Sequence, residues 1–305
     1  MVLAAGLGSR LRPLTTATPK PLVPVGDRPV LAHVLDHLAL GGVARIVVNA
    51  HYGAEALTAF VAGRAGCTVS HESELLGTAG GVARAAVALG RGPVLVWNAD
   101  ILAGIDIASL VAAHAASRPR EAKLVVQPRE RGQGSVGLDH DGWVVRLRGE
   151  RARGAASAEA SGGEFVGVHV LGEGLRGTLP GRGCLVGDVY IPALMRGARL
   201  ASFRWNAPFY DIGSIEAYQA ANLAWLVRRG LVSWTGLGAT VAPGVTLAGS
   251  VVGDGATVVG RGSLERCVVW PGAAAEAPLE DTVVIPGASC GLRMLKQARP
   301  HEPRR

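Results

Sequence analysis

The chain has 305 residues and a formal net charge of +7; 49% of its residues are hydrophobic and 18% are charged. This length suits one large α/β domain with a smaller second domain, and the apolar content suffices for a substantial core. The positive charge favours an anionic substrate, but no basic stripe interleaved with aromatic residues indicates nucleic acid. Four widely spaced cysteines, no recognisable signal peptide and no uncharged apolar run of about 18 residues lead us to expect a cytoplasmic chain without a membrane span.

The chain opens with a short apolar strand that runs into a glycine turn. Val2 to Ala5 are small and apolar, and Gly6 and Gly8 permit backbone angles and close approaches that a Cβ would forbid. Successive N–H groups in such a turn can point at an anion, and Arg10 and Lys20 add positive charge. The segment therefore predicts a polyphosphate site.

Two familiar phosphate loops do not fit this segment. A Walker A loop requires a lysine directly after a glycine, and the dinucleotide fingerprint requires a third glycine where this chain has Leu11. An ordinary glycine turn beside a solvated basic loop is the remaining alternative.

The segment as a whole resembles the opening of the sugar-1-phosphate nucleotidyltransferases. That family reads approximately L-x-G-G-x-G-T-R-L-x-P-L-T and then P-K-x-L-x-P-V; this chain has LAAGLGSRLRPLT at 3–15 and PKPLVPV at 19–25. The resemblance implies that Arg10 and Lys20 are catalytic. It also implies nucleotide contacts from the loop residues Leu3, Ala4, Ala5, Gly6, Gly8, Ser9 and Arg10.

Helices and strands alternate after this segment. Hydrophobic spacing predicts helices over 29–40 and 54–62, and short apolar runs predict strands over 45–49 and 67–70. This alternation predicts an α/β fold with a doubly wound, mostly parallel, Rossmann-like sheet. Ligands of such sheets bind outside the carboxyl ends of the strands, which is where the glycine turn is expected.

The stretch ELLGTAGG at 74–81, ahead of a helix expected over 82–89, resembles the family segment that lies against the nucleotide base. It implies that Gly77 and Thr78 contact the nucleotide. The apolar strand at 93–97 then ends in Asn98-Ala99-Asp100, and a carboxylate at the end of a buried strand is costly unless it meets a cation. The resemblance implies that Asp100 is catalytic and binds metal; the alternative is a turn or helix-capping aspartate.

The sugar-phosphate side of the expected site lies in a hairpin over 134–139 and 143–147. The resemblance implies that Gly137 lets the sugar approach and that Glu164 hydrogen-bonds its hydroxyls. The family's Glu-Lys-Pro is missing here; Arg148 and Arg151 are candidates to replace its lysine, and a solvated basic loop is the alternative. His169, in a strand expected over 164–170, is predicted to be a packed residue rather than a catalyst.

The last part of the chain contains a further acidic motif, a helix and then a repeat of apolar residues. Tyr210-Asp211-Ile212-Gly213-Ser214 resembles the family's second metal-binding segment, so Asp211 is expected to be catalytic and to bind metal with Asp100. A helix is expected over 215–229. Apolar residues then recur every six positions between small-residue turns, which predicts a short left-handed hexapeptide β-helix.

The predicted organisation is a nucleotidyltransferase domain over 1–230, a β-helix over 236–290 and a disordered basic tail over 291–305. The resemblance implies Mg²⁺-dependent, in-line transfer of a nucleotidyl group from an NTP to a sugar 1-phosphate, with release of pyrophosphate. GTP with mannose 1-phosphate is our first expectation, and UTP or dTTP with N-acetylmuramate 1-phosphate or glucose 1-phosphate the second. We also expect a homo-oligomer formed through the β-helix.

Two rival functions remain open. A bifunctional acyltransferase would need many more coils and usually a histidine among them, whereas all eight histidines lie outside the repeats. A non-catalytic regulatory paralogue would keep the architecture and lose the chemistry. The joint presence of Arg10, Lys20, Asp100 and Asp211 argues against that reading, and the missing Glu-Lys-Pro argues for it.

Overall fold

The computed structural model describes residues 1–116, 121–152 and 159–291, without the side chains of 290 and 291. The chain forms two compact units that interleave in sequence. The first consists of Met1–Leu7 and His33–Phe209, and the second of Gly8–Ala32 and residues from 210 onward. The predicted domain division after residue 230 is a division by sequence pattern and stays a prediction.

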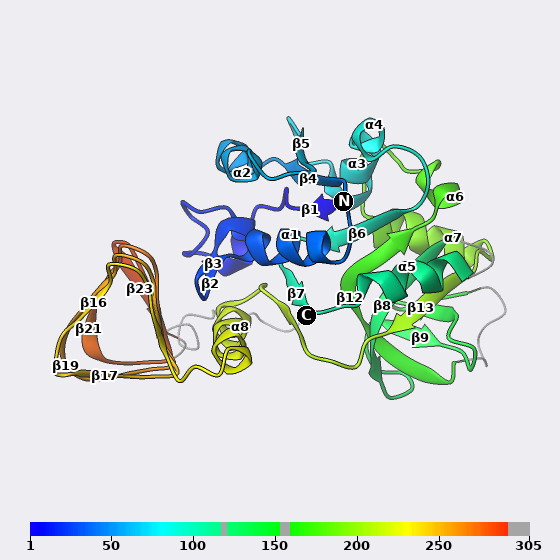
Figure 1. The fold of residues 1–305 in the computed structure, drawn as a ribbon. Coiled ribbons are helices and arrows are strands. Elements are labelled where there is room, and N and C mark those ends of the chain that lie inside the picture. The colour runs from blue at the N-terminus through cyan, green and yellow to red at the C-terminus, as the bar shows by residue number, and fades with distance from the viewer. Residues whose placement is uncertain (117–120, 153–158, 292–305) are drawn as a thin grey trace, which may run out of the picture. The chain divides into compact units, whose positions relative to one another are not determined.

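The first unit is built on one ten-stranded sheet (Figure 1). Its main path runs β11-β10-β9-β12-β6-β1-β4-β5, and β8 joins through β12 and carries β13. The strands are β1 (Val2–Leu3), β4 (Ile46–Ala50), β5 (Cys67–His71), β6 (Val94–Asn98), β8 (Ala122–Arg129), β9 (Val136–Leu138), β10 (Val144–Leu147), β11 (Glu150–Arg151), β12 (Ser161–Leu171) and β13 (Leu200–Arg204).

The half of this sheet formed by β5, β4, β1 and β6 is parallel throughout. Val2 pairs with Val48 on one side and with Trp97 on the other, and all three side chains are buried. Helices pack over this half, including α2 (Ala54–Val61) and α4 (Ala86–Leu89) on β4. Strands covered on both faces read as continuous apolar runs, which is why the sequence predicts them as buried and parallel. The predicted α/β fold class is confirmed.

The other half of the sheet is antiparallel around the long strand β12. This strand pairs antiparallel with β6, β8 and β9, and its register with β8 shifts between Phe165 and His169. Gly167 lies inside this irregularity at φ +83°. The complete sheet is therefore mixed: β9, β10 and β11 form consecutive antiparallel pairs in this half, and β13 pairs parallel with β8 at its edge.

The remaining elements of the first unit are β7 (Ile101–Ala103) and the helices α3 (Gly77–Arg84), α5 (Ile107–Ala116), α6 (Glu173–Arg176) and α7 (Ile191–Met195), with a π-helical turn over Leu185–Tyr190 ahead of α7. The helix that we expected over 82–89 begins earlier, because α3 already starts at Gly77. Gly80 and Gly81 lie inside that helix: a Cβ on Gly80 would approach the Gly181 carbonyl oxygen to 2.5 Å, and one on Gly81 would approach Asn49 Nδ2 to 2.7 Å. Close packing, and not a turn, requires these two glycines.

In the second unit, helix α8 (Ile215–Arg228) joins the hairpin of β2 (Pro24–Val25) and β3 (Arg28–Pro29) to the β-helix. Tyr218 donates its hydroxyl to the Pro24 carbonyl at 2.7 Å and accepts from Trp270 Nε1 at 2.9 Å. Gly26 lies against Trp225 so closely that a Cβ there would fall 2.1 Å from the indole ring. Helix α1 (Val30–Leu40) and strand β14 (Phe209–Asp211) run from one unit into the other.

The expected coils follow α8. Parallel partners lie 17 residues apart, as in Trp234 with Val251 and Val251 with Val268, and the last coil is shortened to 15, as in Val268 with Val283. Five apolar positions of the predicted six-residue pattern are buried: Val252, Val258, Leu264, Val269 and Ala275. The strands are β15 (Trp234–Thr235), β16 (Thr240–Val241), β17 (Val245–Ala248), β18 (Val251–Val252), β19 (Thr257–Glu265), β20 (Val268–Val269), β21 (Ala274–Glu280), β22 (Thr282–Ile285) and β23 (Ala288–Gly291).

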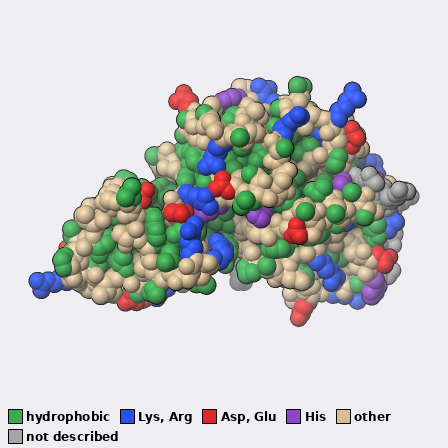
Figure 2. Space-filling model, viewed as in Figure 1, with side chains coloured by type: hydrophobic (Ala, Val, Ile, Leu, Met, Phe, Trp, Pro, Cys, Tyr) green, Lys and Arg blue, Asp and Glu red, His purple; other side chains and the backbone are tan. Residues whose placement is uncertain are grey.

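Three further expectations concern the surface, the cysteines and the tail. On the face drawn in Figure 2, basic side chains are mixed with acidic and neutral ones. Among the described residues, no helix is long and apolar enough to cross a membrane, and Cys67, Cys184 and Cys267 carry free thiols. Gly291 ends β23, and the rest of the predicted disordered tail, 292–305, lies outside the described residues.

Candidate functional site

A pocket of about 290 Å³ opens at the carboxyl ends of the parallel strands in the first unit. Leu3, the last residue of β1, pairs with Asn49 of β4 on one side and with Asn98 of β6 on the other. These three residues meet at one edge because parallel strands end together. The pocket is lined by Leu3, Ala5, Gly6, Asn49, Leu75, Gly77, Thr78, Asn98 and Asp100.

Six predicted site residues line this pocket, although they come from three separate stretches of sequence. Leu3, Ala5 and Gly6 come from the opening segment, Gly77 and Thr78 from the start of α3, and Asp100 from the turn after β6. Ala4 is buried beside them, and its N–H donates to Asn49 Oδ1 at 2.6 Å. Pattern reasoning missed Asn49, Asn98 and Leu75. The two asparagines could have been recognised as polar residues at the carboxyl ends of buried strands.

The wall formed by α3 is fixed by polar contacts as well as by packing. Gly77 has φ +74°, and a Cβ on it would approach the Gly183 carbonyl oxygen to 2.5 Å. The Thr78 hydroxyl accepts from the Leu185 N–H at 2.7 Å. The backbone at the start of α3 is therefore held at a defined distance from the segment 183–185.

In the second unit, the loop from Gly8 to Lys20 is locked by its own contacts. Gly8 has φ +65°, and Thr15 donates its hydroxyl to the Gly8 carbonyl at 2.7 Å. Leu11 is fully buried within the short 3₁₀ turn Ser9–Leu11, so Ser9 and Arg10 are presented at the surface. A loop fixed in this way can present N–H groups and basic side chains to an anion without reordering.

Three charged residues predicted to be catalytic gather in this unit. Lys20 Nζ lies 4.0 Å from Asp211 Oδ1. The position that a Cβ would take on Gly213 is 3.0 Å from Asp211 Oδ1 and 3.4 Å from Arg10 Nη2, so Arg10 and Asp211 both lie beside the Gly213 backbone. Asp211 is half-exposed and Lys20 is largely covered.

The metal expectation can be tested against the available donors. Within the described ranges, no three His, Cys, Asp or Glu side chains cluster as a protein-only metal cage. Magnesium does not need such a cage, since it commonly takes one or two carboxylates and completes its shell with water and substrate phosphates. Asp100 on the pocket wall and the half-exposed Asp211 are oxygen donors of that kind. Each of these carboxylates, taken within its own unit, therefore fits the kind of donor that Mg²⁺ takes together with a polyphosphate.

The residues predicted for the sugar phosphate lie around the hairpin of β9 and β10. Glu164 accepts from Ser135 through both its N–H at 3.2 Å and its hydroxyl at 2.9 Å. Arg148 is exposed at φ +53° in the turn after β10. Arg151 lies 3.3 Å from the buried carboxylate of Glu159.

That buried carboxylate also occupies the space beside Gly137. A Cβ on Gly137 would fall 2.6–2.8 Å from the Glu159 carboxyl group, so one reason for this glycine is the buried side chain that precedes β12. Glu159 pairs with the equally buried Arg146 at 3.0 Å, and neither residue was singled out from the sequence. The sugar-phosphate roles of Gly137, Glu164, Arg148 and Arg151 stay predictions.

Comparison with known proteins supplies an independent line of argument. Residues 1–226 match the Nucleotidyl transferase family. A mannose-1-phosphate guanylyltransferase of Mycobacterium tuberculosis is 30% identical over 91% of this chain and 81% of its own length. An N-acetylmuramate alpha-1-phosphate uridylyltransferase of Caulobacter vibrioides is 34% identical over 56% of this chain and 73% of its own. Among solved structures, HddC from Yersinia pseudotuberculosis, complexed with GMP-PN, superposes with a TM-score of 0.61 at 24% identity over 73% of this chain and 97% of its own.

Proposed function

Since the chain belongs to the nucleotidyl transferase family and is a sugar-1-phosphate nucleotidyltransferase, we propose that it joins GTP to mannose 1-phosphate and releases pyrophosphate. The observation that carries this proposal is the convergence of the opening segment, the start of α3 and Asp100 on one pocket at the strand ends. The choice of GTP and mannose 1-phosphate is supported by the similarity to the Mycobacterium guanylyltransferase, which extends over nearly the whole chain.

The proposed chemistry brings two anions together and needs no covalent nucleophile. A phosphate oxygen of the sugar 1-phosphate attacks the α-phosphorus in line, the bond to the β-phosphate oxygen breaks, and pyrophosphate leaves. N–H groups of Gly6, Gly8 and Ser9 hold the triphosphate, and Arg10 stabilises the β- and γ-phosphates as negative charge grows on them. Lys20 neutralises the charge that gathers on the α-phosphate in the transition state.

Asp100 and Asp211 are the residues proposed to hold Mg²⁺. The ion, when bound, supplies positive charge to the phosphate oxygens of the nucleotide. Thr78 and Gly77 are proposed to contact the base, and Arg148 or Arg151 the sugar phosphate in place of the missing lysine.

A second substrate pair is favoured by a different observation. Ala5 stands where the family pattern has its first glycine, a replacement that resembles the uridylyltransferases, and the Caulobacter relative is by its name an N-acetylmuramate alpha-1-phosphate uridylyltransferase. UTP with N-acetylmuramate 1-phosphate is therefore the alternative. Two further alternatives have to be distinguished from these: an enzyme that uses dTTP or glucose 1-phosphate, and a non-catalytic paralogue.

The test is pyrophosphate release with Mg²⁺ over four NTPs and several sugar 1-phosphates. The highest kcat/KM for GTP with mannose 1-phosphate supports the proposal. A preference for another pair corrects the substrate, and no release with any pair supports the non-catalytic alternative.

Asp100→Asn provides the matched test of the site. Removing the carboxylate charge while keeping the shape is expected to lower kcat by at least about 100-fold and to leave the melting temperature within about 2 °C of the parent. Asp141→Asn, at an exposed hairpin position, serves as the control with unchanged kcat. An Asp100→Asn variant with near-normal turnover would remove Asp100 from the proposed machinery.

A further inference from the structure

A buried polar pair lies at the pocket of the first unit, where Asn49 lines the pocket and Glu72 is hydrogen-bonded to Asn49. Asn49 and Glu72 are 3% and 5% exposed, and Asn49 Nδ2 donates to Glu72 Oε1 at 2.6 Å. The remaining oxygens of both side chains reach backbone on opposite sides. Asn49 Oδ1 accepts from the Ala4 N–H at 2.6 Å, and Glu72 Oε2 accepts from the Leu76 N–H at 3.1 Å.

These three hydrogen bonds form one continuous connection between the two walls of the pocket. Ala4 lies in the opening segment between the pocket-lining residues Leu3 and Ala5, and Leu76 lies between Leu75 and Gly77 on the opposite wall. The connection crosses from Ala4 through both side chains to Leu76. A change in the length of any of its bonds therefore changes the distance between the walls.

The helix beside the pair has a glycine where the pair needs room. A Cβ on Gly81 of α3 would fall 2.7 Å from both Asn49 Nδ2 and Glu72 Oε1. Helix interiors disfavour glycine, so its presence here fits a requirement for space at the Asn49–Glu72 contact.

A buried glutamate is also an unusual way to build a purely structural contact. Burial of a carboxylate costs free energy that only good hydrogen bonds offset, and an apolar pair of similar volume would fill the same space. What an apolar pair cannot do is bind two backbone N–H groups on opposite walls and thereby fix their separation.

We propose that Asn49 and Glu72 are positioning residues that set the width of the nucleotide pocket and thereby the affinity for the NTP. The inference rests on the proposed function in one respect, that this pocket binds the nucleotide. Neither side chain is assigned a contact with a reacting atom; Glu72 acts through Leu76, and Asn49 acts through Ala4.

The directions of the three hydrogen bonds suggest a test by exchange of donor and acceptor. Glu72→Gln alone places an amide where both neighbours are N–H donors, so one of the bonds to Asn49 or Leu76 is lost. Asn49→Asp alone brings two carboxylates face to face. The double variant Asn49→Asp with Glu72→Gln restores all three bonds. Its new amide at position 72 can donate to the new carboxylate at position 49 and accept from Leu76, while that carboxylate still accepts from Ala4. The total charge of the double variant equals that of the parent.

The measurement is kcat and KM for GTP, together with the dissociation constant for GTP alone by calorimetry. Each single variant is expected to raise both KM and the dissociation constant about tenfold, with kcat within about twofold, and the double variant to restore them to within about threefold. Gly81→Ala is expected to raise KM in the same way, because its methyl group pushes the pair apart. Asp36→Asn is the control: it removes one carboxylate charge from the ion pair with Arg64 at 3.0 Å and does not line the pocket.

The outcomes separate this inference from the proposed function. If the single variants lower the melting temperature but leave KM unchanged, the pair has only a structural role. If the double variant is as impaired as the single variants, the pattern of hydrogen bonds does not determine the affinity for GTP. Either result overturns the inference. If the parent binds GTP without turnover and the exchange still restores binding, the proposed function fails and the inference stands. A parent that binds no nucleotide overturns both.

Discussion

His169 is a titratable side chain that is buried among aromatic rings. It lies in β12 at 2% exposure, between the rings of Phe165 and Tyr190, with centroid distances of 5.5 and 5.4 Å. Neither ring nitrogen has a hydrogen-bond partner in the described part of the chain. Burial lowers the pKa of His169 to about 3, so the imidazole stays neutral in the folded protein.

This burial makes the stability of the fold sensitive to mild acid. Below about pH 6.5 the unfolded chain binds a proton at His169 and the folded chain does not, so a falling pH favours unfolding. Between pH 7 and pH 5 this one group should cost about 2 kcal/mol of unfolding free energy. His169→Phe should reduce the loss between those two pH values by that amount in denaturant titrations. An equal loss in parent and variant would contradict the assignment.

Glu159 has the opposite linkage. Its carboxylate accepts from Arg146 Nε at 3.1 Å and from the Gly132 N–H at 3.0 Å, and these bonds, that of Arg146 above all, hold the pKa of Glu159 below its ordinary value. The stabilisation is present at neutral pH and is lost as the pH falls through this lowered pKa.

Glu159→Gln should therefore destabilise the protein by about 3 kcal/mol at pH 7, because it leaves the buried guanidinium of Arg146 without its charge partner. The difference between parent and variant should shrink below about pH 4, because the unfolded parent then binds a proton at Glu159 while the folded parent keeps the carboxylate charged. Chemical denaturation at pH 7 and pH 3.5 measures both values, and a difference independent of pH would show that charge is not the cause.

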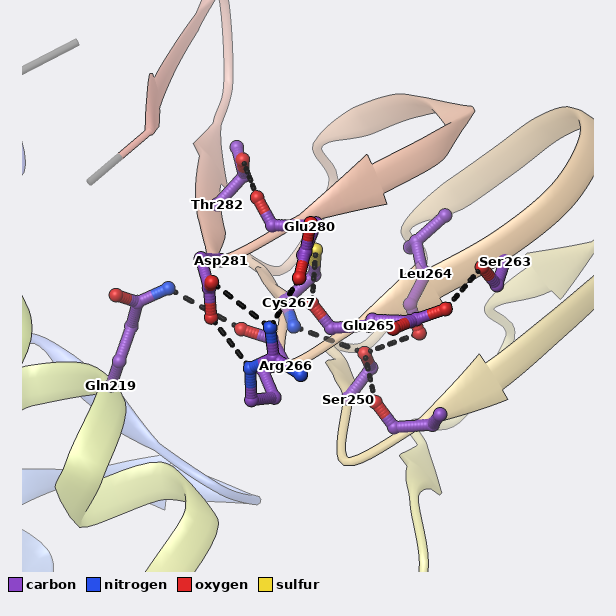
Figure 3. A network of polar contacts seen from close by, with 11 residues as sticks. Gln219, Ser250, Ser263, Leu264, Glu265, Arg266, Cys267, Glu280, Asp281 and Thr282 are labelled. Carbon is purple, nitrogen blue, oxygen red and sulfur yellow. Dashed lines mark hydrogen bonds and ion pairs between the residues drawn. The ribbon is translucent and has the colours of Figure 1, made fainter. Parts of the chain in front are cut away.

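At the scale of elements, the β-helix turns one of its corners through left-handed residues. Gly249, Arg266 and Asp281 occupy equivalent positions in successive coils at φ +59°, +52° and +48°. Figure 3 shows the Arg266 side chain directed at the next coil, where it bonds Asp281 Oδ1 at 2.7 Å, Asp281 Oδ2 at 3.0 Å and Glu280 Oε1 at 2.6 Å. Gln219 of α8 donates to the Arg266 carbonyl at 3.3 Å in the same network.

At this corner we expect glycine to give a more stable protein than alanine, which is the reverse of the usual order. Both Arg266→Ala and Arg266→Gly lose the ion pairs, but only alanine keeps a Cβ at positive φ, which L-residues adopt at a cost. The glycine variant should melt higher than the alanine variant by on the order of 2 °C. The same two changes at Arg261, in strand β19 outside the positive-φ positions, should give the ordinary order, with alanine higher.

The last coil bears on the homo-oligomer that the sequence analysis leads us to expect. In the part of the chain that the structure describes, β21 pairs only with β19, so its other edge has no strand beside it. That strand contains Pro278 as well as Glu276 and Glu280, and proline and charge are devices that prevent edge-to-edge pairing. We therefore expect any oligomer to use another surface of the β-helix.

At the scale of the whole molecule, the predicted site residues do not divide between the two units in the order in which they occur along the chain. Arg10, Lys20 and Asp211 belong to the second unit, whereas Asp100, Gly77 and Thr78 belong to the first. Residues from opposite ends of the sequence, such as Lys20 and Asp211, lie together within one unit. A boundary drawn along the sequence at residue 230 could not express this, because units form by contact and not by chain order.

The family, the fold class and part of the pocket could be predicted from the sequence, since they depend on residue type and local spacing. The opening motif, the alternation of helices and strands, the carboxylate after β6 and the six-residue repeat are local patterns. They predicted the family, the fold class and six residues of the pocket. Local patterns are reliable where a backbone conformation or a buried face needs particular residues over a few neighbouring positions.

Only the tertiary structure decided what depends on partners distant in sequence. The antiparallel half of the sheet, the carboxylate of Glu159 beside Gly137, and the connection from Ala4 through Asn49 and Glu72 to Leu76 all join segments tens of residues apart or from different strands. A sequence records each of these residues but not which of them meet, because burial and hydrogen bonding are properties of the packed chain.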